Sequence, residues 1–356
     1  MASRAARRIV SAPSSLAIVG ERVSSRIDAL LAAERDRWWR VDDDLEHPFA
    51  MLRRFVARGG KRLRPTFCYW AFVGAGGDRE DPMIIDAGAG LELLHTFALL
   101  HDDVMDGSDL RRGEPAMHKA FASEHESGLW RGDAGRFGDG AAILVGDLAF
   151  VYADLMTRAI PAGARPVFDE ARVELCAGQY LDLIGMMRSE RDADRAAKIA
   201  RYKSGKYTVE RPLHFGAALA GHLDKFGMEL SAVGLPLGDA FQLRDDVLGV
   251  FGEPEATGKP VGDDLRQGKL TQLLAAAVIR LGDEGALARV GARDLTEDEV
   301  QTIQDAIAAS GALAEIEDLI ERRLDEALAA IETLPFGHEA KDALRDVALY
   351  VAWRVN

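Results

Sequence analysis

Apolar residues recur every three to four positions through several long stretches of this 356-residue chain. This spacing places them on one face of an α-helix, whereas a half-buried strand alternates apolar and polar residues, a pattern that the sequence lacks. The clearest periodic stretches are Val167–Met187, Arg195–Gly221, Met228–Val250 and Leu313–Ile331. No linker rich in Pro or Ser divides the chain. We therefore expect a single-domain, all-α bundle whose helices, about 20 residues and about 30 Å long, frame a deep central cavity.

An aspartate cluster closes the apolar segment 87–100, which has the pattern of a helix packed on most sides. Asp102 and Asp106 are four residues apart and share a helix face, and Asp103 lies one turn before Asp106. Two carboxylates about 5–6 Å apart repel each other by roughly 3 kcal/mol at an effective dielectric constant of about 20. Mg²⁺ would relieve this repulsion, because it takes one or two carboxylates and completes its shell with water and phosphate oxygens. A lone aspartate pair is more often only a solvated helix end, so the residues around this cluster decide its interpretation.

A second acidic cluster, Asp245 and Asp246, lies on another apolar helix. Asp239, Gln242 and Asp246 follow one another at i, i+3 and i+7, so they occupy one face of that helix. Basic segments accompany both clusters, at 59–65, 107–115 and 258–269. One guanidinium group can donate two parallel hydrogen bonds to the oxygens of a phosphate. Glycines just before the start of a helix are also typical of phosphate-binding sites. Acidic and basic centres at several helix ends are what bridging a diphosphate between helices requires.

Four motifs in this order resemble the polyprenyl synthetase family of trans-isoprenyl diphosphate synthases. They are Gly59-Gly60-Lys61-Arg62-Leu63-Arg64-Pro65, the Asp102–Asp106 cluster followed by Arg111-Arg112-Gly113, Tyr202-Lys203-Ser204-Gly205-Lys206, and Phe241-Gln242-Leu243-Arg244-Asp245-Asp246. The likeness runs from about Phe49 to the C-terminus. Within the family, the wording of the motifs is most similar to actinobacterial geranylgeranyl diphosphate synthases.

The resemblance implies a head-to-tail condensation. An allylic diphosphate (dimethylallyl, geranyl or farnesyl diphosphate) ionises, the double bond of isopentenyl diphosphate attacks the cation, and loss of a proton leaves a new trans double bond. Such a reaction needs charge and positioning around a departing diphosphate rather than a nucleophilic side chain, and the sequence has no convincing Ser-His-Asp or Cys-His set. The implied product is geranylgeranyl diphosphate, with farnesyl diphosphate or a longer polyprenyl diphosphate as alternatives. The implied assembly is a homodimer.

Motif matching also implies a role for each site residue. The metal ligands would be Asp102, Asp103, Asp106, Asp245 and Asp246, holding about three Mg²⁺ ions with substrate bound. The allylic diphosphate would contact Arg111, Lys203, Ser204, Gln242 and Lys259. The isopentenyl diphosphate would contact Gly60, Lys61, Arg64, His95 and Arg112. The residues implied in catalysis are Asp102, Asp103, Asp106, Lys203, Gln242, Asp245, Asp246 and Lys259.

Some positions have a simpler interpretation or depart from the family pattern. His95 lies on an apolar helix, where a lone histidine is often only a core residue. Lys206 and Arg211 are expected to be surface charges. The family's fullest second motif has a third Asp where this chain has Gly249, and loss of such an outer acid weakens metal binding by on the order of 10–100-fold without excluding catalysis.

Side chains one or two turns before Asp102 should form the floor that limits product length, because the growing chain descends along this helix. These residues are Leu94, Phe97 and Ala98. An aromatic residue beside the small Ala98 resembles the pattern of geranylgeranyl diphosphate synthases. The alternative is that Phe97 only packs the bundle and the floor lies deeper.

Charge and composition restrict the partners and the location. A net charge of −14 argues against nucleic acid, because duplex binding needs a basic face. Cys68 and Cys176 have no metal or redox spacing, so we expect small core residues in a reducing, cytoplasmic compartment. No run of about 18 apolar residues is evident, so we expect no transmembrane segment. Residues 1–20 are rich in Arg and Ser and contain no acid, as in a disordered basic tail or a transit peptide, and residues 21–356 should form the catalytic domain.

Two rival functions share part of this pattern. A class I terpene cyclase would be all-α with an Asp-rich first motif, but its second metal site is usually Asn/Asp-x-x-Ser/Thr-x-x-x-Glu, and it would not need Lys61 and Arg64. A non-catalytic partner subunit of a synthase typically loses carboxylates from both motifs, whereas this chain keeps five of them.

Overall fold

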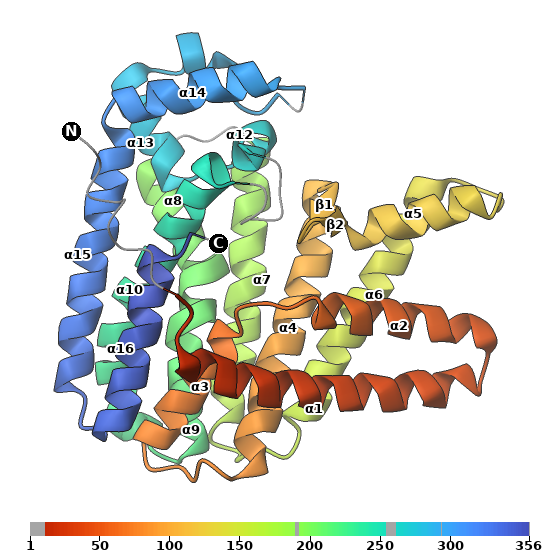
Figure 1. Cartoon of the computed structure of the whole chain (residues 1–356), viewed down its shortest axis with the longest axis vertical. Coiled ribbons are helices and arrows are strands. Elements are labelled where there is room, and N and C mark those ends of the chain that lie inside the picture. The colour runs from red at the N-terminus through yellow and green to blue at the C-terminus, as the bar shows by residue number, and fades with distance from the viewer. Residues whose placement is uncertain (1–10, 189–191, 254–260, 293, 356) are drawn as a thin grey trace.

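The computed structural model describes residues 11–188, 192–253, 261–292 and 294–355, and the all-α prediction is confirmed (Figure 1). The helices, including the π-helix η3 and the short 3-10 helices η2 and η4, are α1 (Ser14–Trp39), η2 (Asp43–Leu45), α2 (Glu46–Ala57), α3 (Leu63–Gly74), α4 (Pro82–Asp106), α5 (Met117–Ser127), α6 (Ala134–Met156), α7 (Arg165–Met187), α8 (Ala193–Ala200), η3 (Arg201–Glu210), α9 (Arg211–Leu219), α10 (Leu223–Phe251), α12 (Asp263–Gln267), α13 (Gln272–Leu281), η4 (Gly285–Arg289), α14 (Glu297–Ala309), α15 (Ala312–Thr333) and α16 (His338–Trp353).

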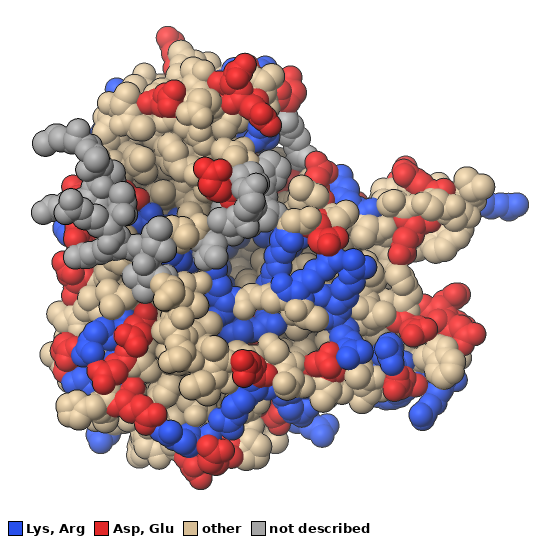
Figure 2. Space-filling view, in the orientation of Figure 1, with Lys and Arg blue, Asp and Glu red and all other residues tan. Residues whose placement is uncertain are grey.

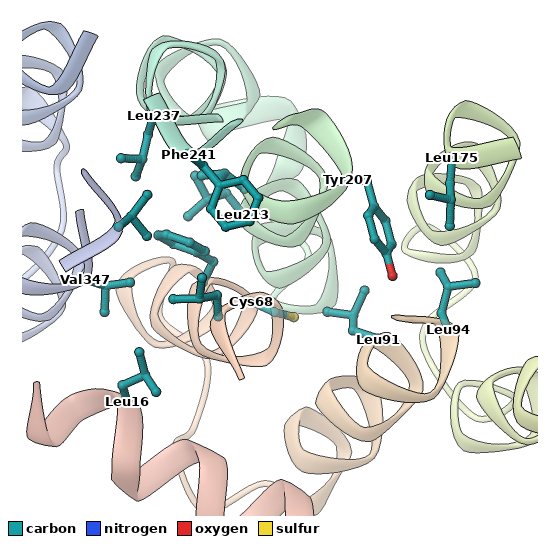
Figure 3. Close-up of a cluster of buried hydrophobic side chains, with 14 of the residues drawn as sticks. Leu16, Cys68, Leu91, Leu94, Leu175, Tyr207, Leu213, Leu237, Phe241 and Val347 are labelled. Atoms are coloured by element: carbon teal, nitrogen blue, oxygen red, sulfur yellow. The ribbon is translucent and has the colours of Figure 1, made fainter. Parts of the chain in front are cut away.

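The four stretches with the clearest periodicity are all helical in the structure. Three of them are α7, α10 and α15, and the fourth spans α8, η3 and α9 without a break. Helices α4, α7 and α10 run roughly parallel to the long axis, whereas the α1–α2 and α5–α6 pairs project to one side (Figure 1). The main hydrophobic core contains residues from Leu16 to Ala352. Figure 3 shows part of it, with Leu91 and Leu94 of α4 facing Tyr207 of η3.

Local signals set both ends of α4, the helix that carries the first aspartate cluster. Asp81 caps its start by accepting a hydrogen bond from the Met83 N–H, and Pro82 occupies the first helical position, where its missing N–H costs nothing. Gly107 ends the helix with φ of 63°, the left-handed conformation that favours glycine. Asp106 is therefore the last residue of the helix.

A two-residue antiparallel ladder follows α4 and orients the two arginines of the first motif. Strand β1 (Leu110–Arg111) pairs with β2 (Glu114–Pro115), and the turn residues Arg112 and Gly113 have φ of 54° and 76°. Two consecutive positive φ values are typical of a tight hairpin turn. This ladder was not expected from the sequence, because two residues are too few to show alternation.

Two other sequence-based predictions are corrected, and a third observation bears on the expected absence of a transmembrane segment. Helix α1 begins at Ser14 and buries Leu16 and Val19, so residues 14–20 belong to the folded body rather than to a disordered tail, while residues 1–10 lie outside the described part. Cys68 is buried as expected, but Cys176 is exposed. Helix α4 passes a length and hydropathy criterion for a membrane span, although 67% of the tested stretch is buried inside the protein. A buried core helix passes the same criterion.

Candidate active site

One cavity of about 900 Å³ collects most of the residues that the motifs singled out. Lys and Arg side chains gather around a hollow on this face of the molecule (Figure 2). The predicted site residues that line the cavity are Gly60, Lys61, Arg64, His95, Ala98, Asp102, Arg111, Arg112, Lys203, Ser204, Gln242, Asp245 and Asp246. They come from segments between residues 60 and 246 that only the fold brings together. Lys259 lies outside the described residues.

The end of α4 forms one acidic side of the site, which we call the first wall: Asp102, Asp103 and Asp106. Asp102 Oδ1 accepts hydrogen bonds from Gln179 Nε2 at 2.7 Å and from Lys203 Nζ at 2.9 Å. Burial alone would raise the pKa of Asp102, but Lys203, Lys269 and Arg111 outweigh it and hold the pKa well below its usual range. Asp102 is therefore ionised and surrounded by cations.

The other two acids of the first wall lie behind Asp102 and do not line the cavity. Asp103 is fully buried and accepts from Arg111 Nε at 2.9 Å and 3.1 Å, and Arg111 Nη2 also pairs with it. Asp106 pairs with Lys269 Nζ at 3.2 Å. Burial raises the pKa of Asp106, and Lys269 only partly offsets this. Their predicted role as metal ligands stays a prediction.

Helix α10 supplies the second wall: Gln242, Asp245 and Asp246. Asp246 accepts from Gln242 Nε2 at 2.8 Å and from the Gln272 backbone N–H at 3.1 Å. Burial raises the pKa of Asp246 to about 8, the Gln242 hydrogen bond lowers it in part, and the charge of Asp264 raises it further. The carboxylate of Asp245 pairs with Arg354, whose guanidinium is fully buried and lies 4.4 Å above the Phe241 ring.

The missing third acid of the second motif leaves a space that another acid fills. A Cβ atom at Gly249 would overlap the Oδ2 atom of Asp264, which lies on α12. Asp264 lines the cavity beside Asp246 and lies 3.9 Å from Lys269 Nζ. The chain therefore keeps a carboxylate at this place, supplied by a different helix.

A group of basic residues beside the first wall forms what we call the cation pocket: Lys61, Arg64, His95 and Arg112, with Gly60. Arg64 Nη2 donates to Thr208 at 2.8 Å, and its guanidinium lies 4.4 Å above the Tyr207 ring. Burial, with the charge of Arg354, lowers the pKa of Lys61 to about 8. Burial and the surrounding arginines hold the pKa of His95 well below its ordinary value, so its imidazole is neutral.

The loop that presents the cation pocket is held by a buried ion pair. Arg62 has φ of 49° and pairs with Glu92, and it also donates to the Val56 carbonyl at 2.9 Å and to Ser24 at 3.2 Å. A Cβ at Gly60 would lie 3.0 Å from Arg112 Nη2, so glycine allows the loop and this arginine to approach each other. Arg62 thus supports the pocket rather than pointing a free charge into it.

Several residues of the site were not predicted. Gln179 and Asp182 of α7 contact Asp102 and Lys203, Lys269 contacts Asp106, and Arg354 contacts Asp245. Gln179 and Asp182 lie on the face of α7 that lines the cavity, but α7 carries several other charged residues, so the sequence alone did not single these two out. Nothing in the local sequence of Arg354, two residues from the C-terminus, indicated that it reaches the second wall.

The predicted product floor is corrected. Phe97 packs against His101 and Phe150, with ring centroids 4.6 Å and 4.9 Å apart, and does not line the cavity. Leu94 is fully buried in the core and does not line it either. Ala98 and Leu99 are the α4 residues that border the cavity one turn before Asp102.

The donor chemistry of the two walls fits a hard divalent cation. Within the described ranges, no group of three or more His, Cys, Asp or Glu side chains is clustered closely enough to enclose a metal. The carboxylates of Asp102, Asp245 and Asp246 line one cavity. An ion that takes one or two carboxylates and fills its shell with phosphate oxygens and water matches this donor set, whereas a closed cage of protein ligands does not.

Comparisons with known proteins agree with this geometry. The family model described as "Polyprenyl synthetase" matches residues 47–307. A geranylgeranyl pyrophosphate synthase from Corynebacterium glutamicum, solved with isoprenyl diphosphate and magnesium, is 34% identical with a TM-score of 0.90, covering 95% of this chain and 99% of that one.

Two curated relatives make different products. The geranylfarnesyl diphosphate synthase of Aeropyrum pernix is 32% identical over 85% of this chain and 92% of its own length. The (2E,6E)-farnesyl diphosphate synthase of Mycobacterium tuberculosis is 29% identical over 83% of this chain and 80% of its own. From the matching family model, the shared fold and the two aspartate motifs that contribute to one cavity, we conclude that the chain belongs to the polyprenyl synthetase family and is a prenyltransferase.

Proposed function

We propose that this protein condenses isopentenyl diphosphate with an allylic diphosphate in an Mg²⁺-dependent reaction and releases geranylgeranyl diphosphate. The observation that carries the proposal is one cavity that is lined by Asp102 of the first motif, by Asp245 and Asp246 of the second motif, and by the residues of the cation pocket. Bound between the walls, Mg²⁺ would withdraw charge from the departing diphosphate and so favour ionisation of the allylic substrate. Asp102, Asp106, Asp245 and Asp246 would hold it, with Asp103 orienting Arg111.

The cations around the first wall would stabilise the charge that develops on the leaving group. Lys203 and Arg111 already lie against Asp102, and both line the cavity. Preorganised charges of this kind act strongly because they need no rearrangement during the reaction. Lys259, on the segment before α12, is proposed to join them. Ser204 and Gln242 would direct side-chain dipoles toward the forming carbocation.

The cation pocket would hold isopentenyl diphosphate without a metal. Lys61, Arg64 and Arg112 bring three positive charges to the cavity, and Gly60 lines it beside them. The His95 Nδ1 atom is buried without a hydrogen-bond partner among the described residues, so a phosphate oxygen could satisfy it. Fixing this substrate beside the allylic site places its double bond for attack on the carbocation.

We also propose that the protein is a cytoplasmic homodimer. Helix α6 exposes Phe137, Leu144 and Val151 at a spacing of seven residues, and α7 exposes Val173, Tyr180 and Met187 at the same spacing. Apolar residues every seven positions form a stripe suited to packing against another helix. Burial of these stripes in a second copy removes large apolar side chains from water. Both cysteines are free, which fits a reducing compartment.

The purified chain, assayed alone, tests the proposed function. It is incubated with isopentenyl diphosphate and each allylic primer, with Mg²⁺ or with EDTA, and the dephosphorylated product is sized by chromatography. We expect Mg²⁺-dependent formation of geranylgeraniol. A cyclic hydrocarbon formed from the primer alone would indicate a terpene cyclase, and turnover only after a second protein is added would indicate a partner subunit. Farnesol or a longer alcohol would correct the product but not the reaction.

A further inference from the structure

The helix that presents Lys203 to the cavity is wound unusually over its ten residues. Residues 201–210 form the π-helix η3, between the ordinary helices α8 and α9. Lys203, Ser204 and Tyr207 of η3 line the cavity. A π-helix places more residues in each turn than an α-helix, so the direction of each side chain depends on where the wide turns begin. A contact that fixes this register also fixes where the Lys203 ammonium lies.

One face of α7 lies directly against η3. Glu174, Gly178 and Asp182 are spaced by four residues and therefore share that face. Asp182 accepts a hydrogen bond from Lys203 Nζ at 2.6 Å, on the cavity side. Gly178 lies so close to η3 that a Cβ atom there would overlap the backbone nitrogen of Lys203. The backbones of α7 and η3 are therefore in contact at Lys203.

The third residue of this face, Glu174, holds η3 at a point that does not border the cavity. Its carboxylate pairs with Lys206 of η3 and accepts two hydrogen bonds from Arg211, from Nε at 2.6 Å and from Nη2 at 2.7 Å. Arg211 is the first residue after η3. The sequence-based expectation that Lys206 and Arg211 are surface charges is wrong, because their side chains are only 15% and 18% exposed.

The group around Glu174 is buried and balanced in charge. Glu174 and Glu210 are 7% and 6% exposed, and they face the two cations Lys206 and Arg211. Glu210 also accepts from Ser231 Oγ of α10 at 2.8 Å. A buried ion pair is a poor source of stability compared with apolar packing, so stability alone does not account for this group.

Helix α10 closes the opposite side of η3 at the backbone. A Cβ at Gly234 would lie 2.6 Å from the Glu210 Cα, and a Cβ at Gly238 would lie 2.7 Å from the Gly205 carbonyl oxygen. With α7 on one side and α10 on the other, η3 has no room to slide except along its own axis. Glu174 opposes that movement, because it binds one residue within η3 and the first residue beyond it.

We propose that Glu174 is a positioning residue that fixes the register of η3 and thereby holds the Lys203 ammonium between Asp102 and Asp182. This inference rests on the proposed function, in which Lys203 neutralises the leaving diphosphate. Without the Glu174 carboxylate, Lys206 and Arg211 lose the acceptor that they share, and we expect η3 to shift along α7. A displacement of about 1 Å at a catalytic group can cost on the order of 100-fold in rate.

The test compares Glu174→Gln with Glu170→Gln, in the unmodified chain and in a Lys203→Ala background. Glu170 is an exposed acid one turn earlier on α7, so the control makes the same change of charge on the same helix. We expect Glu174→Gln to lower kcat by about 10- to 100-fold in the unmodified background but by less than about threefold once Lys203 is gone. Glu170→Gln should leave kcat within about twofold in both. A kcat for Glu174→Gln within twofold of the unmodified chain, or equal losses in both backgrounds, would overturn the proposal.

A second variant and a second measurement cover the case in which Glu174→Gln does not fold. Glu174→Gln/Arg211→Gln removes one acid and one cation, so the buried group stays balanced, and we expect the same loss of kcat. Amide hydrogen exchange across residues 201–210 should be faster in this variant than in Glu170→Gln. Unchanged exchange and unchanged kcat would contradict a positioning role. If the unmodified chain is inactive, the proposed function is contradicted instead. The hydrogen-exchange rates of residues 201–210 would still show whether Glu174 holds η3.

Discussion

The two acidic walls of the cavity compensate their charge in different ways. On the first wall, each aspartate has a cationic partner: Lys203 and Arg111 for Asp102, Arg111 for Asp103, and Lys269 for Asp106. On the second wall, Asp246 is held by a side-chain amide and a backbone N–H, and burial raises its pKa to about 8.

This difference indicates what each wall contributes before substrate arrives. The first wall is already neutralised, so a metal and a diphosphate must share its carboxylates with cations that are in place before substrate binds. On the second wall Asp246 has no cationic partner among the described residues, and its raised pKa of about 8 keeps the carboxyl group largely protonated near neutral pH. A cation that binds there must therefore displace a proton, whereas on the first wall it must compete with Lys203, Arg111 and Lys269.

The largest effect is expected from removing one carboxylate from either wall. Asp102→Ala and Asp245→Ala should each lower kcat/KM by about 10³-fold or more, because each removes charge that acts on the leaving group. Circular dichroism should show an unchanged helix content. The control is Asp109→Ala, which removes an exposed acid just beyond α4 whose carboxylate pairs with the surface residue Lys119. Near-normal rates for Asp102→Ala would contradict the proposed role of the first wall in binding metal and diphosphate.

A pH profile of isopentenyl diphosphate binding, compared between the unmodified chain and Lys61→Arg, tests Lys61 of the cation pocket. The pKa of Lys61 is lowered to about 8, so the ammonium of the free protein is present below pH 8 and is lost as the pH rises through 8. A bound diphosphate favours the charged form, so the Kd of isopentenyl diphosphate should rise by up to about tenfold per pH unit above 8. Calorimetry without metal measures this directly. In Lys61→Arg, which stays charged, the slope should largely disappear, and an unchanged slope would exclude Lys61 as its source.

Position 249 tests how the second wall replaced its third acid. Gly249→Asp adds a charge where the Asp264 carboxylate already lies, so Asp264 must move and Asp246 gains another like charge. We expect the Mg²⁺ concentration for half-maximal rate to change by about tenfold. Gly249→Ala adds a side chain without a charge, so it separates the effect of displacing Asp264 from the effect of the added charge. Gly249→Asp/Asp264→Ala should return close to the unmodified value, and a failure to do so would show that the two acids are not interchangeable.

Substitutions on α4 one turn before the first wall should have the smallest effect on the rate but a clear effect on product length. Ala98→Phe should shorten the product, because Ala98 borders the cavity one turn before Asp102. Phe97→Ala should leave product length unchanged, because its ring packs against His101 and Phe150. Gas chromatography of the dephosphorylated products measures both. Longer products from Phe97→Ala would instead support the sequence-based prediction that Phe97 limits product length.

The sequence was sufficient for the fold class and for most of the site, because helical periodicity and motif spacing are local properties. It placed the long helices α7, α10 and α15 correctly, and it selected thirteen residues that line one cavity. Phe97 was misplaced because adjacent helical residues point about 100° apart, so one step in sequence separates the cavity from the α6 side. Local pattern could not resolve that step.

The remaining errors concern contacts made only in three dimensions. Lys206 and Arg211 looked like surface charges until Glu174, more than thirty residues earlier, was found to bury them. Arg354 reaches Asp245 across more than one hundred residues. The π-helix was also invisible, because an extra residue per turn changes the register without changing the composition of the segment. Each case requires the packing of one helix against another.

Crystals grown with Mn²⁺ and an unreactive thiolo analogue of the allylic diphosphate would test most directly whether both walls act on one leaving group. The anomalous signal of manganese locates each ion without ambiguity. We expect ions on the first wall at Asp102 and on the second wall at Asp245 or Asp246, with one diphosphate bridging them. Ions confined to a single wall, or a diphosphate bound away from both, would contradict the proposed mechanism.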